Sequence, residues 1–384
     1  MGTATPSAEG RRRLLLPAAV LGAYALLLTA CGQAPEASNS SEPAGSASAT
    51  GAAAEVGSDN SDYTGCIVSD EGGFDDRSFN QSSYEGLKAA EEEFGIEIRE
   101  AESNSVGEYV PNLNAMLDAD CNLVVAVGFQ LGDTMKPIAE DNAETKFVCV
   151  DVTAPGFPEN VRNIIYDTAQ GAFLAGYLAA GMTETGTVAT YGGMEIPTVS
   201  IFMDGFARGV EHYNEVKGED VRVLGWDTEN RTGSFIGDFS NQNAGKTNTA
   251  NFINEGADII MPVAGPVGLG TIDAVKEANG GGKDVKVIWV DSDGYETTQD
   301  GEVILTSVMK RMGDAVKQVI AEDINDEFTS EAYVGTLEND GVALAPFHDF
   351  EDAVPQELKD ELEALEAGIV SGEIEVGSED SPEA

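Results

Sequence analysis

Histidine is almost absent from this chain of 384 residues, which contains only His212 and His348. Hydrolases of the Ser-His-Asp and Cys-His types need a histidine beside the nucleophile as a general base. Here His212 lies in a charged stretch, GVEHYNEVKGED, and His348 lies near the acidic end of the chain, so neither is well placed for that role. The sequence also lacks an HExxH pattern or another clustered set of metal ligands. We therefore expect no catalytic residues, no metal site and no cofactor.

Basic residues are scarce as well: 21 Lys and Arg stand against 68 Asp and Glu, which gives a formal net charge of −47. A surface of this charge repels nucleic acids and anionic membrane surfaces, so both are poor candidate partners. The excess of acids instead predicts a heavily hydrated exterior. The hydrophobic content of 42% is ordinary for a globular protein, and the length suggests two domains or lobes.

An apolar run near the N-terminus, residues 14–30, follows three arginines, Arg11 to Arg13. This charged-then-apolar order is that of an export signal, and a run of about 17 residues is short for a membrane-spanning helix. It ends in Leu28-Thr29-Ala30-Cys31, which resembles the bacterial lipobox, whose cysteine receives lipid after cleavage. We expect a lipoprotein signal peptide over 1–30 and lipidation of Cys31. The alternative is an uncleaved anchor with an incidental cysteine.

The segment after the expected cleavage site, residues 31–61, is rich in Ser, Ala, Gly and Pro and has no hydrophobic periodicity. Such a composition predicts a flexible tether. The mature protein is then expected on the extracytoplasmic face of a bacterial cell membrane, to which the lipid on Cys31 attaches it.

Cysteine is rare, and three cysteines remain beside Cys31. Cys66 and Cys121 each lie at the entry of an expected strand, in GCIVSD and DCNLVVAVG. Neighbouring parallel strands would bring these two side chains together, and an oxidising exterior would preserve a disulfide between them. The alternative is a pair of buried thiols. Cys149, in KFVCVD, is expected to be an inert core thiol.

Short apolar runs rich in Val and Ile alternate with segments of helical periodicity throughout the rest of the chain. The runs lack apolar–polar alternation, which favours strands covered on both faces as in parallel sheets. We expect strands at 66–70, 96–101, 123–128, 146–151, 187–193, 221–226, 258–265, 285–291 and 303–308. The predicted class is α/β, with two doubly wound lobes in series and a ligand cleft at the carboxyl ends of their strands.

The stretch GGFDDRSFNQSSYEG, residues 72–86, joins the first expected strand to a helix. Ser78 followed by Gln81 fits a capping box, which predicts a helix that begins at Phe79. Asn80 and Tyr84 then lie on one helical face near the cleft, and the loop places Asp75 and Asp76 at its mouth. These groups suit a neutral ligand with hydroxyls or a heteroaromatic ring. The alternative is that the acids only favour the helix dipole, Asn80 is solvated and Tyr84 is a core residue.

The same stretch resembles the start of the basic membrane protein family, lipoprotein substrate-binding components of ABC importers, several of which bind purine nucleosides. The resemblance continues through GAFLAGYLAAGM, GSFIGDF, GADIIMPVAG, VIWVDSDG, ILTSVMKR and SGEIEV, and covers roughly residues 65–376. It implies the type I periplasmic-binding fold, in which two α/β lobes joined by several crossovers close on a ligand.

The resemblance also implies lobe boundaries. The N-terminal lobe is expected to contain 62–167 and 294–326, and the C-terminal lobe 168–293 and 327–376. Residues 377–384 are expected to form an acidic, solvated tail.

The site implied by the resemblance holds a nucleoside base between aromatic rings and the ribose with carboxylates and a lysine. Asp75 and Asn80 are expected at polar edges of the ligand, and Tyr84 and Phe235 at the stacking positions, with Phe239 in reserve. Gly265 ends an expected strand and begins the glycine-rich segment 265–270, which we interpret as a tight turn that lines the pocket. The residues assigned to the ribose are Gly265, Asp291 and Lys310, and Asp151 and Phe129 are further candidates.

The expected function is that of a monomeric, lipid-anchored receptor that passes a nucleoside-like solute to the permease subunits of an ABC importer. Three alternatives remain from the sequence. The ligand is another neutral solute such as a sugar, or the protein is an adhesion or signalling lipoprotein. An enzyme, either a nucleoside hydrolase or a glycosidase, is the least favoured, because Asp75 and Asp76 are adjacent and would share one environment, whereas acid–base catalysis needs separate roles.

Overall fold

The computed structural model describes residues 56–153 and 155–382. The expected signal peptide, Cys31 and most of the expected tether therefore lie outside the described residues. Within the described part, no helix is long and apolar enough to cross a membrane.

The first lobe is built on a six-stranded sheet in which every pair of neighbours is parallel. Its central strands are buried on both faces, as the uninterrupted apolar runs predict. In spatial order the strands are β13 (Tyr333–Gly335), β5 (Val161–Tyr166), β4 (Lys146–Val150), β3 (Leu123–Val127), β1 (Thr64–Val68) and β2 (Glu97–Ala101).

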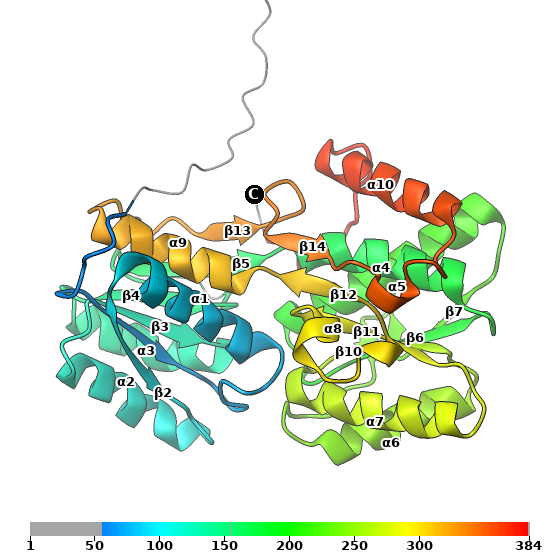
Figure 1. The fold of residues 1–384 in the computed structure, drawn as a ribbon, viewed down its shortest axis with the longest axis horizontal. Helices are drawn as coiled ribbons and strands as arrows, with labels where there is room; N and C mark the ends of the chain where they lie inside the picture. The colour runs from blue at the N-terminus through cyan, green and yellow to red at the C-terminus, as the bar shows by residue number, and fades with distance from the viewer. Residues whose placement is uncertain (1–55, 154, 383–384) are drawn as a thin grey trace, which may run out of the picture. The chain divides into compact units, whose positions relative to one another are not determined.

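Helices cover both faces of this sheet (Figure 1). On one face α1 (Phe79–Phe94) packs beside α9 (Met312–Ile324), and their apolar side chains join one core cluster with Ile67 and Leu123. On the other face α2 (Tyr109–Asp118) and α3 (Phe129–Asp141) pack on Cys66, Val124 and their neighbours. Alternate residues of the central strands thus point into two separate cores.

The second lobe repeats this arrangement around a second six-stranded sheet, parallel except for its last strand, β14, which is antiparallel to β12. In spatial order its strands are β14 (Val342–Leu344), β12 (Ile304–Lys310), β11 (Lys286–Asp291), β10 (Ile259–Val263), β6 (Thr187–Gly192) and β7 (Arg222–Leu224). A short hairpin of β8 (Trp226–Asp227) and β9 (Thr232–Gly233) follows β7. The helices of this lobe are α4 (Thr168–Met182), α5 (Pro197–Lys217), α6 (Gln242–Asn254), α7 (Gly268–Gly280), α8 (Gly294–Thr297) and α10 (Gln356–Val370).

Helices α4 and α5 cross at very short range on one face of this sheet. A Cβ added at Gly176 would lie 2.0 Å from the carbonyl oxygen of Phe206, and one at Gly209 would lie 2.0 Å from that of Phe173. Only glycine permits such an approach of two backbones. The glycines of GAFLAGYLAAGM and FMDGFARGV are therefore needed for the packing of the second lobe.

The predicted α/β class with two parallel-sheet lobes is confirmed. Each of the nine predicted strands exists, with its ends displaced by no more than two residues. The strand β5 was not predicted, because Arg162 and Asn163 interrupt its apolar pattern. The three-residue strands β13 and β14 are too short to carry a periodic signal.

The chain passes between the two sheets after β5, after β12, and again between β13 and β14. Strand β12 pairs within the second sheet and β13 within the first, whereas the expected boundaries assigned 294–326 to the N-terminal lobe and 327–376 to the C-terminal lobe. The reason is that each of these strands pairs with residues far away in the sequence, and local patterns do not specify such partners.

The end of the described chain also differs from the solvated tail that was expected over 377–384. Ser378 Oγ donates to Asp204 Oδ2 at 2.7 Å, and Ser381 Oγ donates to Asp167 Oδ1 at 2.7 Å. Between them, the carboxylate of Asp380 forms an ion pair with Arg231. These residues are held against the second lobe and the first crossover.

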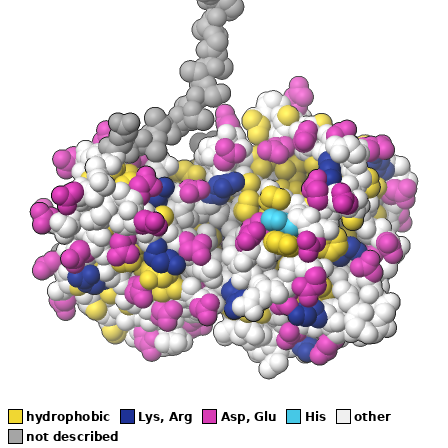
Figure 2. Space-filling model, viewed as in Figure 1, with side chains coloured by type: hydrophobic (Ala, Val, Ile, Leu, Met, Phe, Trp, Pro, Cys, Tyr) yellow, Lys and Arg dark blue, Asp and Glu magenta, His cyan; other side chains and the backbone are white. Residues whose placement is uncertain are grey.

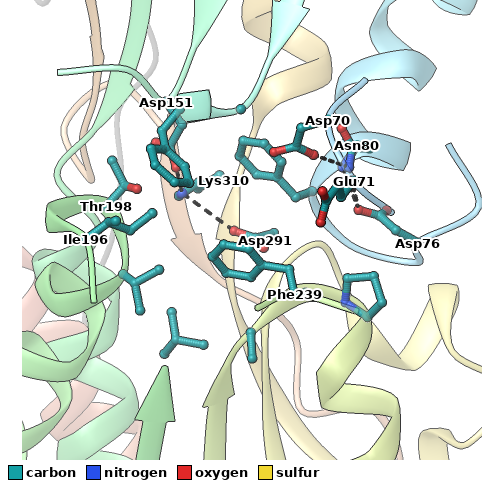
Figure 3. A pocket seen from close by; sticks show the side chains of 18 of the residues that line it. Asp70, Glu71, Asp76, Asn80, Asp151, Ile196, Thr198, Phe239, Asp291 and Lys310 are labelled. Atoms are coloured by element: carbon teal, nitrogen blue, oxygen red, sulfur yellow. Dashed lines mark hydrogen bonds and ion pairs between the residues drawn. The ribbon is translucent and has the colours of Figure 1, made fainter. Parts of the chain in front are cut away.

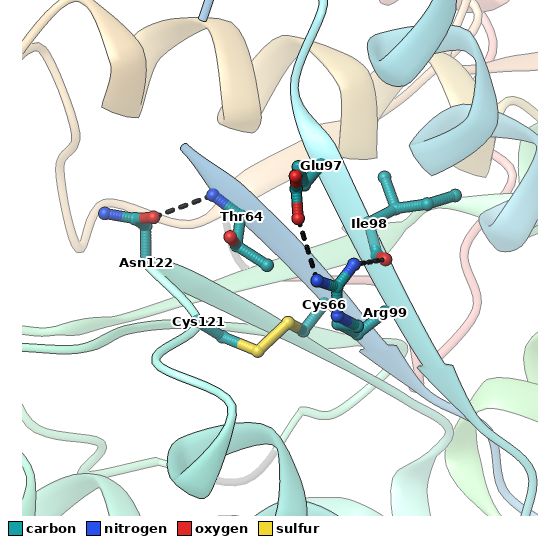
Figure 4. Close-up of a disulfide and its surroundings, with 7 residues drawn as sticks. All are labelled: Thr64, Cys66, Glu97, Ile98, Arg99, Cys121 and Asn122. Atoms are coloured by element: carbon teal, nitrogen blue, oxygen red, sulfur yellow. Dashed lines mark hydrogen bonds and ion pairs between the residues drawn. A yellow bond between two sulfur atoms is a disulfide. The ribbon is translucent and has the colours of Figure 1, made fainter. Parts of the chain in front are cut away.

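A disulfide joins Cys66 in β1 to Cys121, which lies just before the neighbouring strand β3 (Figure 4). The two Cα atoms are 6.0 Å apart, within the usual range for this bond. Cys149, in β4, is a buried free thiol.

We predict that the double variant Cys66→Ala/Cys121→Ala is strongly destabilised. The bond closes a loop with a sequence separation of 55, and the chain-entropy model assigns such a bond about 4 kcal/mol of the free energy of unfolding. Urea denaturation of the variant and the wild type would measure the difference. Wild type unfolded in the presence of a thiol reductant should match the variant, and an unchanged midpoint in both would contradict the prediction.

Acidic side chains are spread over the face of the molecule shown in Figure 2, with few Lys and Arg between them. We predict that the melting temperature rises by several degrees between about 0.05 M and about 1 M NaCl, because salt screens repulsion between exposed like charges. Differential scanning calorimetry would measure this shift, with sorbitol at equal osmolality as the uncharged control. An equal shift in sorbitol would show that screening is not the cause.

Candidate functional site

A pocket lies between the two lobes, at the carboxyl ends of strands from both sheets (Figure 3). This is where open parallel sheets bind ligands. The first lobe lines it with Asp70, Glu71, Asp76, Phe79, Asn80, Gly128, Phe129 and Asp151. The second lobe lines it with Ile196, Thr198, Val199, Phe202, Phe239, Val263, Ala264, Gly265, Pro266, Asp291 and Lys310.

Two aspartates from opposite lobes meet one lysine in this pocket. Asp151 directly follows β4, Asp291 ends β11, and Lys310 ends β12. Lys310 Nζ lies 2.6 Å from Asp151 Oδ2 and 3.6 Å from Asp291 Oδ1, and all three side chains are buried. Burial raises the pKa of Asp151, while the charge of Lys310 and its hydrogen bond oppose this shift.

Both aspartates have left-handed backbone conformations, with φ of +64° at Asp151 and +71° at Asp291. Positive φ is uncommon outside glycine, although aspartate tolerates it better than most residues. The two strands that carry them, β4 and β11, occupy the same position in the strand order of their sheets. Each sheet therefore turns one carboxylate into the pocket by the same unusual backbone turn, and such conformations cluster at ligand sites.

Aromatic rings surround the lysine. Its Nζ lies 5.0 Å from the ring centroid of Phe202, 5.3 Å from that of Phe79 and 5.9 Å from that of Tyr166. These distances are in the range of cation–π contacts, which strengthen when water is excluded. The rings and carboxylates together fix the ammonium group at the bottom of the pocket.

A second polar group lies on the first-lobe wall of the pocket. Asn80 Nδ2 donates to Asp70 Oδ1 at 2.9 Å and to Asp76 Oδ2 at 3.3 Å. Asn80 Oδ1 is buried and has no hydrogen-bond partner among the described residues. A buried amide oxygen without a partner is costly, so this atom is available to accept a hydrogen bond from a ligand.

Burial raises the pKa of both acids in this group. The pKa of Asp70 rises to about 8, although the hydrogen bond from Asn80 opposes the shift. The pKa of Asp76 rises to about 6, and its three hydrogen bonds from backbone N–H groups hold it lower than burial alone would. Asp70 is therefore able to carry a proton near neutral pH and to donate as well as accept.

Helix α1 begins at Phe79 as predicted, but the cap differs from the predicted capping box. Ser78 makes no side-chain cap hydrogen bond. The Asp76 carboxylate instead accepts from the N–H groups of Ser78, Asn80 and Gln81, at 3.0, 2.8 and 3.0 Å. Asp76, two residues before the cap position, thus accepts the hydrogen bonds of the first turn. The Ser78 hydroxyl is therefore available for other partners.

The structure brings most of the expected site residues to the pocket, namely Asn80, Phe129, Asp151, Phe239, Gly265, Asp291 and Lys310. Three others lie elsewhere. Asp75 is exposed on the loop. The ring of Tyr84 packs on Phe74 at 4.6 Å, and its hydroxyl donates to Glu100. Phe235 packs edge-on against Trp226 at 6.0 Å.

Sequence reasoning did not single out the rings of Phe79 and Phe202 or the acids Asp70 and Glu71 as ligand residues. Asp70 carried a signal, since it ends the first expected strand. Phe79 carried one as well, because the first residue of a helix that follows such a strand faces the cleft. Phe202 lies inside α5 and is indistinguishable by sequence from a core residue.

No group of three or more His, Cys, Asp or Glu side chains in the described ranges is arranged to hold a metal ion. Among the described lining residues of the pocket, Lys310 is the one basic side chain that opposes the charges of the carboxylates. The site offers hydrogen-bond acceptors and aromatic faces to a small molecule.

Comparison with known proteins gives a family match over most of the chain. Residues 64–380 match the family model described as ABC transporter substrate-binding protein PnrA-like. Among curated proteins, the chain is 29% identical over 308 residues to "Basic membrane protein A" of Borreliella afzelii, covering 79% of this chain and 88% of the relative. It is 30% identical over 332 residues to "ABC transporter nucleoside-binding protein BmpA" of Lactococcus lactis subsp. cremoris, covering 83% and 90%.

Solved structures support the fold. An ABC transporter solute-binding protein from Aeropyrum pernix K1 is similar with a TM-score of 0.74 and 24% identity, covering 82% of this chain and 92% of that one. An ABC transporter solute-binding protein from Conexibacter woesei has a TM-score of 0.61 at 17% identity, covering 83% and 100%. At these identities the likeness concerns the fold alone.

We predict that Asp70→Asn stabilises the ligand-free protein increasingly as pH rises. Because the folded protein raises the pKa of Asp70 from 3.8 to about 8, it binds this proton more tightly than the unfolded chain does. Wild type therefore loses stability between these two pKa values as pH increases, whereas the amide does not titrate. The gap in unfolding free energy should widen by at most about 1.4 kcal/mol per pH unit, measured by urea denaturation at several pH values from 5.5 to 8.5.

The matched control is Asp75→Asn, which removes an exposed carboxylate of the same loop. A gap that does not grow with pH in Asp70→Asn, or that grows equally in the control, would contradict the prediction.

Proposed function

Because the chain belongs to the PnrA-like family of ABC transporter substrate-binding proteins, we propose that it binds a purine nucleoside and delivers it to the permease of an ABC importer. The family is one of binding proteins, and the proposed function includes no bond making or breaking. The Lactococcus lactis relative is named a nucleoside-binding protein, which supports the choice of ligand.

The observation that carries this proposal is the combination of chemistry in the pocket: aromatic side chains from both lobes beside a buried carboxylate–lysine–carboxylate cluster. A nucleoside presents a planar base and a ribose with vicinal hydroxyls. Aromatic faces suit the base, and carboxylates accept hydrogen bonds from hydroxyls.

We assign the residues accordingly. Since Tyr84 and Phe235 lie outside the pocket, the stacking role passes to Phe79 of the first lobe and Phe239 of the second. Asp291, Lys310 and Asp151 bind the ribose hydroxyls, and Gly265, whose φ is +50°, lies in the turn beside them. Asp70 and Asn80 bind the edge of the base. The free acceptor, Asn80 Oδ1, selects bases with an N–H group at that edge.

The charge of the pocket distinguishes a nucleoside from a nucleotide. Asp70, Glu71, Asp76, Asp151 and Asp291 line it, and Lys310 is the one basic residue among the described lining residues. A phosphate would face uncompensated carboxylates in a place where charges are poorly screened. The proposed ligand is therefore uncharged.

The sequence of residues 1–61 extends the proposal to location. We propose that the signal over 1–30 is cleaved and that lipid on Cys31 holds the monomeric receptor on the extracytoplasmic face of a bacterial membrane, within reach of its permease. Mass spectrometry of the protein from native membranes would detect a lipid on an N-terminal Cys31.

We predict that isothermal titration calorimetry detects binding of inosine, guanosine or adenosine, and that Asp291→Asn weakens it at least about tenfold, as expected when one charged hydrogen bond to a ligand is lost. Phe239→Ala should weaken binding by a similar factor through the loss of stacking. Tighter binding of ribose or another free sugar than of any nucleoside, or no heat with any nucleoside, would overturn the proposal.

Tyr84→Phe is the matched control for these variants. It removes only a hydroxyl outside the pocket and should leave the dissociation constant within about twofold, which is inside the usual effect of a surface change. A large loss of affinity in this variant would indicate that Tyr84 contacts the ligand.

A further inference from the structure

Outside the pocket, the loop before α1 contacts the second lobe through Arg77. The carbonyl oxygen of Arg77 accepts from Trp289 Nε1 at 3.3 Å. The hydroxyls of Ser292 and Thr297 each lie 3.0 Å from the same oxygen. Each hydroxyl has one proton and other acceptors nearby, so these groups share the carbonyl while the indole always donates.

The backbone of Arg77 is turned for this contact. Its φ is +60°, which is unusual for a residue with a long side chain. The side chain also reaches across, since Nη1 lies 3.4 Å from the carbonyl oxygen of Thr297. An uncommon conformation that aims a carbonyl at three donors indicates a built contact rather than an incidental one.

The next residue connects this contact to the pocket. Ser78 Oγ, which the helix cap does not use, lies 2.9 Å from Asp291 Oδ2 and 3.2 Å from the carbonyl oxygen of Val290. Asp76, a pocket residue, holds the N–H of Ser78 at 3.0 Å. The loop before α1 therefore contacts Asp291, the carboxylate of the second lobe that we propose to bind the ribose.

We propose that Arg77, Ser78, Trp289, Ser292 and Thr297 form an interlobe clasp that holds the lobes closed around the ligand and positions the Asp291 carboxylate. The two lobes are connected through three crossovers. The hydrogen bonds of the Arg77 carbonyl, the Arg77 guanidinium and the Ser78 hydroxyl described above all join the first lobe to the second. Opening of the cleft therefore breaks these hydrogen bonds, and water replaces the partners from the opposite lobe. Since none of its side chains lines the ligand pocket, the clasp retains the ligand without touching it. The identity of the ligand used below rests on the proposed function.

We expect the double variant Ser292→Ala/Thr297→Val of the full chain to release a bound nucleoside about tenfold faster, because loss of two weak bonds lowers the barrier to opening. The association rate should not fall, since encounter uses the open form, which the double variant populates at least as much as wild type. Stopped-flow displacement of a fluorescent nucleoside measures both rates. The single variant Thr297→Ser retains both hydroxyls and should release the nucleoside as slowly as wild type.

Thr298→Val is the matched control. Its hydroxyl bonds the carbonyl oxygen of Gly294 at 2.6 Å, within the second lobe, so the change is chemically the same but leaves the clasp intact. Release as fast in this control as in the double variant would overturn the clasp, as would unchanged release in the double variant.

Small-angle scattering without ligand separates this inference from the proposed function. The double variant should have a larger radius of gyration than wild type and than Thr298→Val. If no nucleoside binds any of these proteins, the proposed function fails, and the scattering difference alone decides the clasp. Equal radii in that case would overturn it.

Discussion

The ammonium group of Lys310, shared between Asp151 and Asp291, is the interaction on which the geometry of the site depends. Lys310 and Asp291 end adjacent strands of the second sheet, whereas Asp151 follows a strand of the first. One buried cation thus pairs with a carboxylate from each lobe, and without it two buried acids would repel each other. This charge therefore favours the approach of the two lobes at this point.

Polar contacts between the lobes also account for positive φ angles at three residues near the cleft. Asp151, Asp291 and Arg77 all have positive φ and all lie where a chain segment of one lobe meets the other. Each cost in backbone strain is offset by polar contacts across the cleft: Asp151 with Lys310, Asp291 with Ser78, and Arg77 with Trp289 and its neighbours. These three contacts between the lobes are polar, and water can replace them without exposing apolar surface.

The fold was largely predictable from the sequence, because buried parallel strands leave uninterrupted Val- and Ile-rich runs and their carboxyl ends identify the cleft. Asp291 was placed at the cleft in this way, whereas Lys310 was named only through the family resemblance. Of the two rings proposed to stack on the base, Phe239 was the reserve candidate and Phe79 was missed. Phe79 and Asn80 are neighbours on α1 and both line the pocket, whereas Tyr84, one turn after Asn80, packs on Phe74 outside it. Strand pairing across crossovers, as for β12 and β13, depends on partners far away in sequence and left no local signal.

The docked C-terminal segment has a practical consequence for handling the protein. Ser378, Asp380 and Ser381 contact Asp204, Arg231 and Asp167, so the final described residues are seated on the second lobe and reach the segment that links the lobes. An affinity tag or fluorescent fusion attached directly after them would interfere sterically with these contacts. A spacer after the last residue, or a purification handle at another place in the chain, would leave these contacts undisturbed.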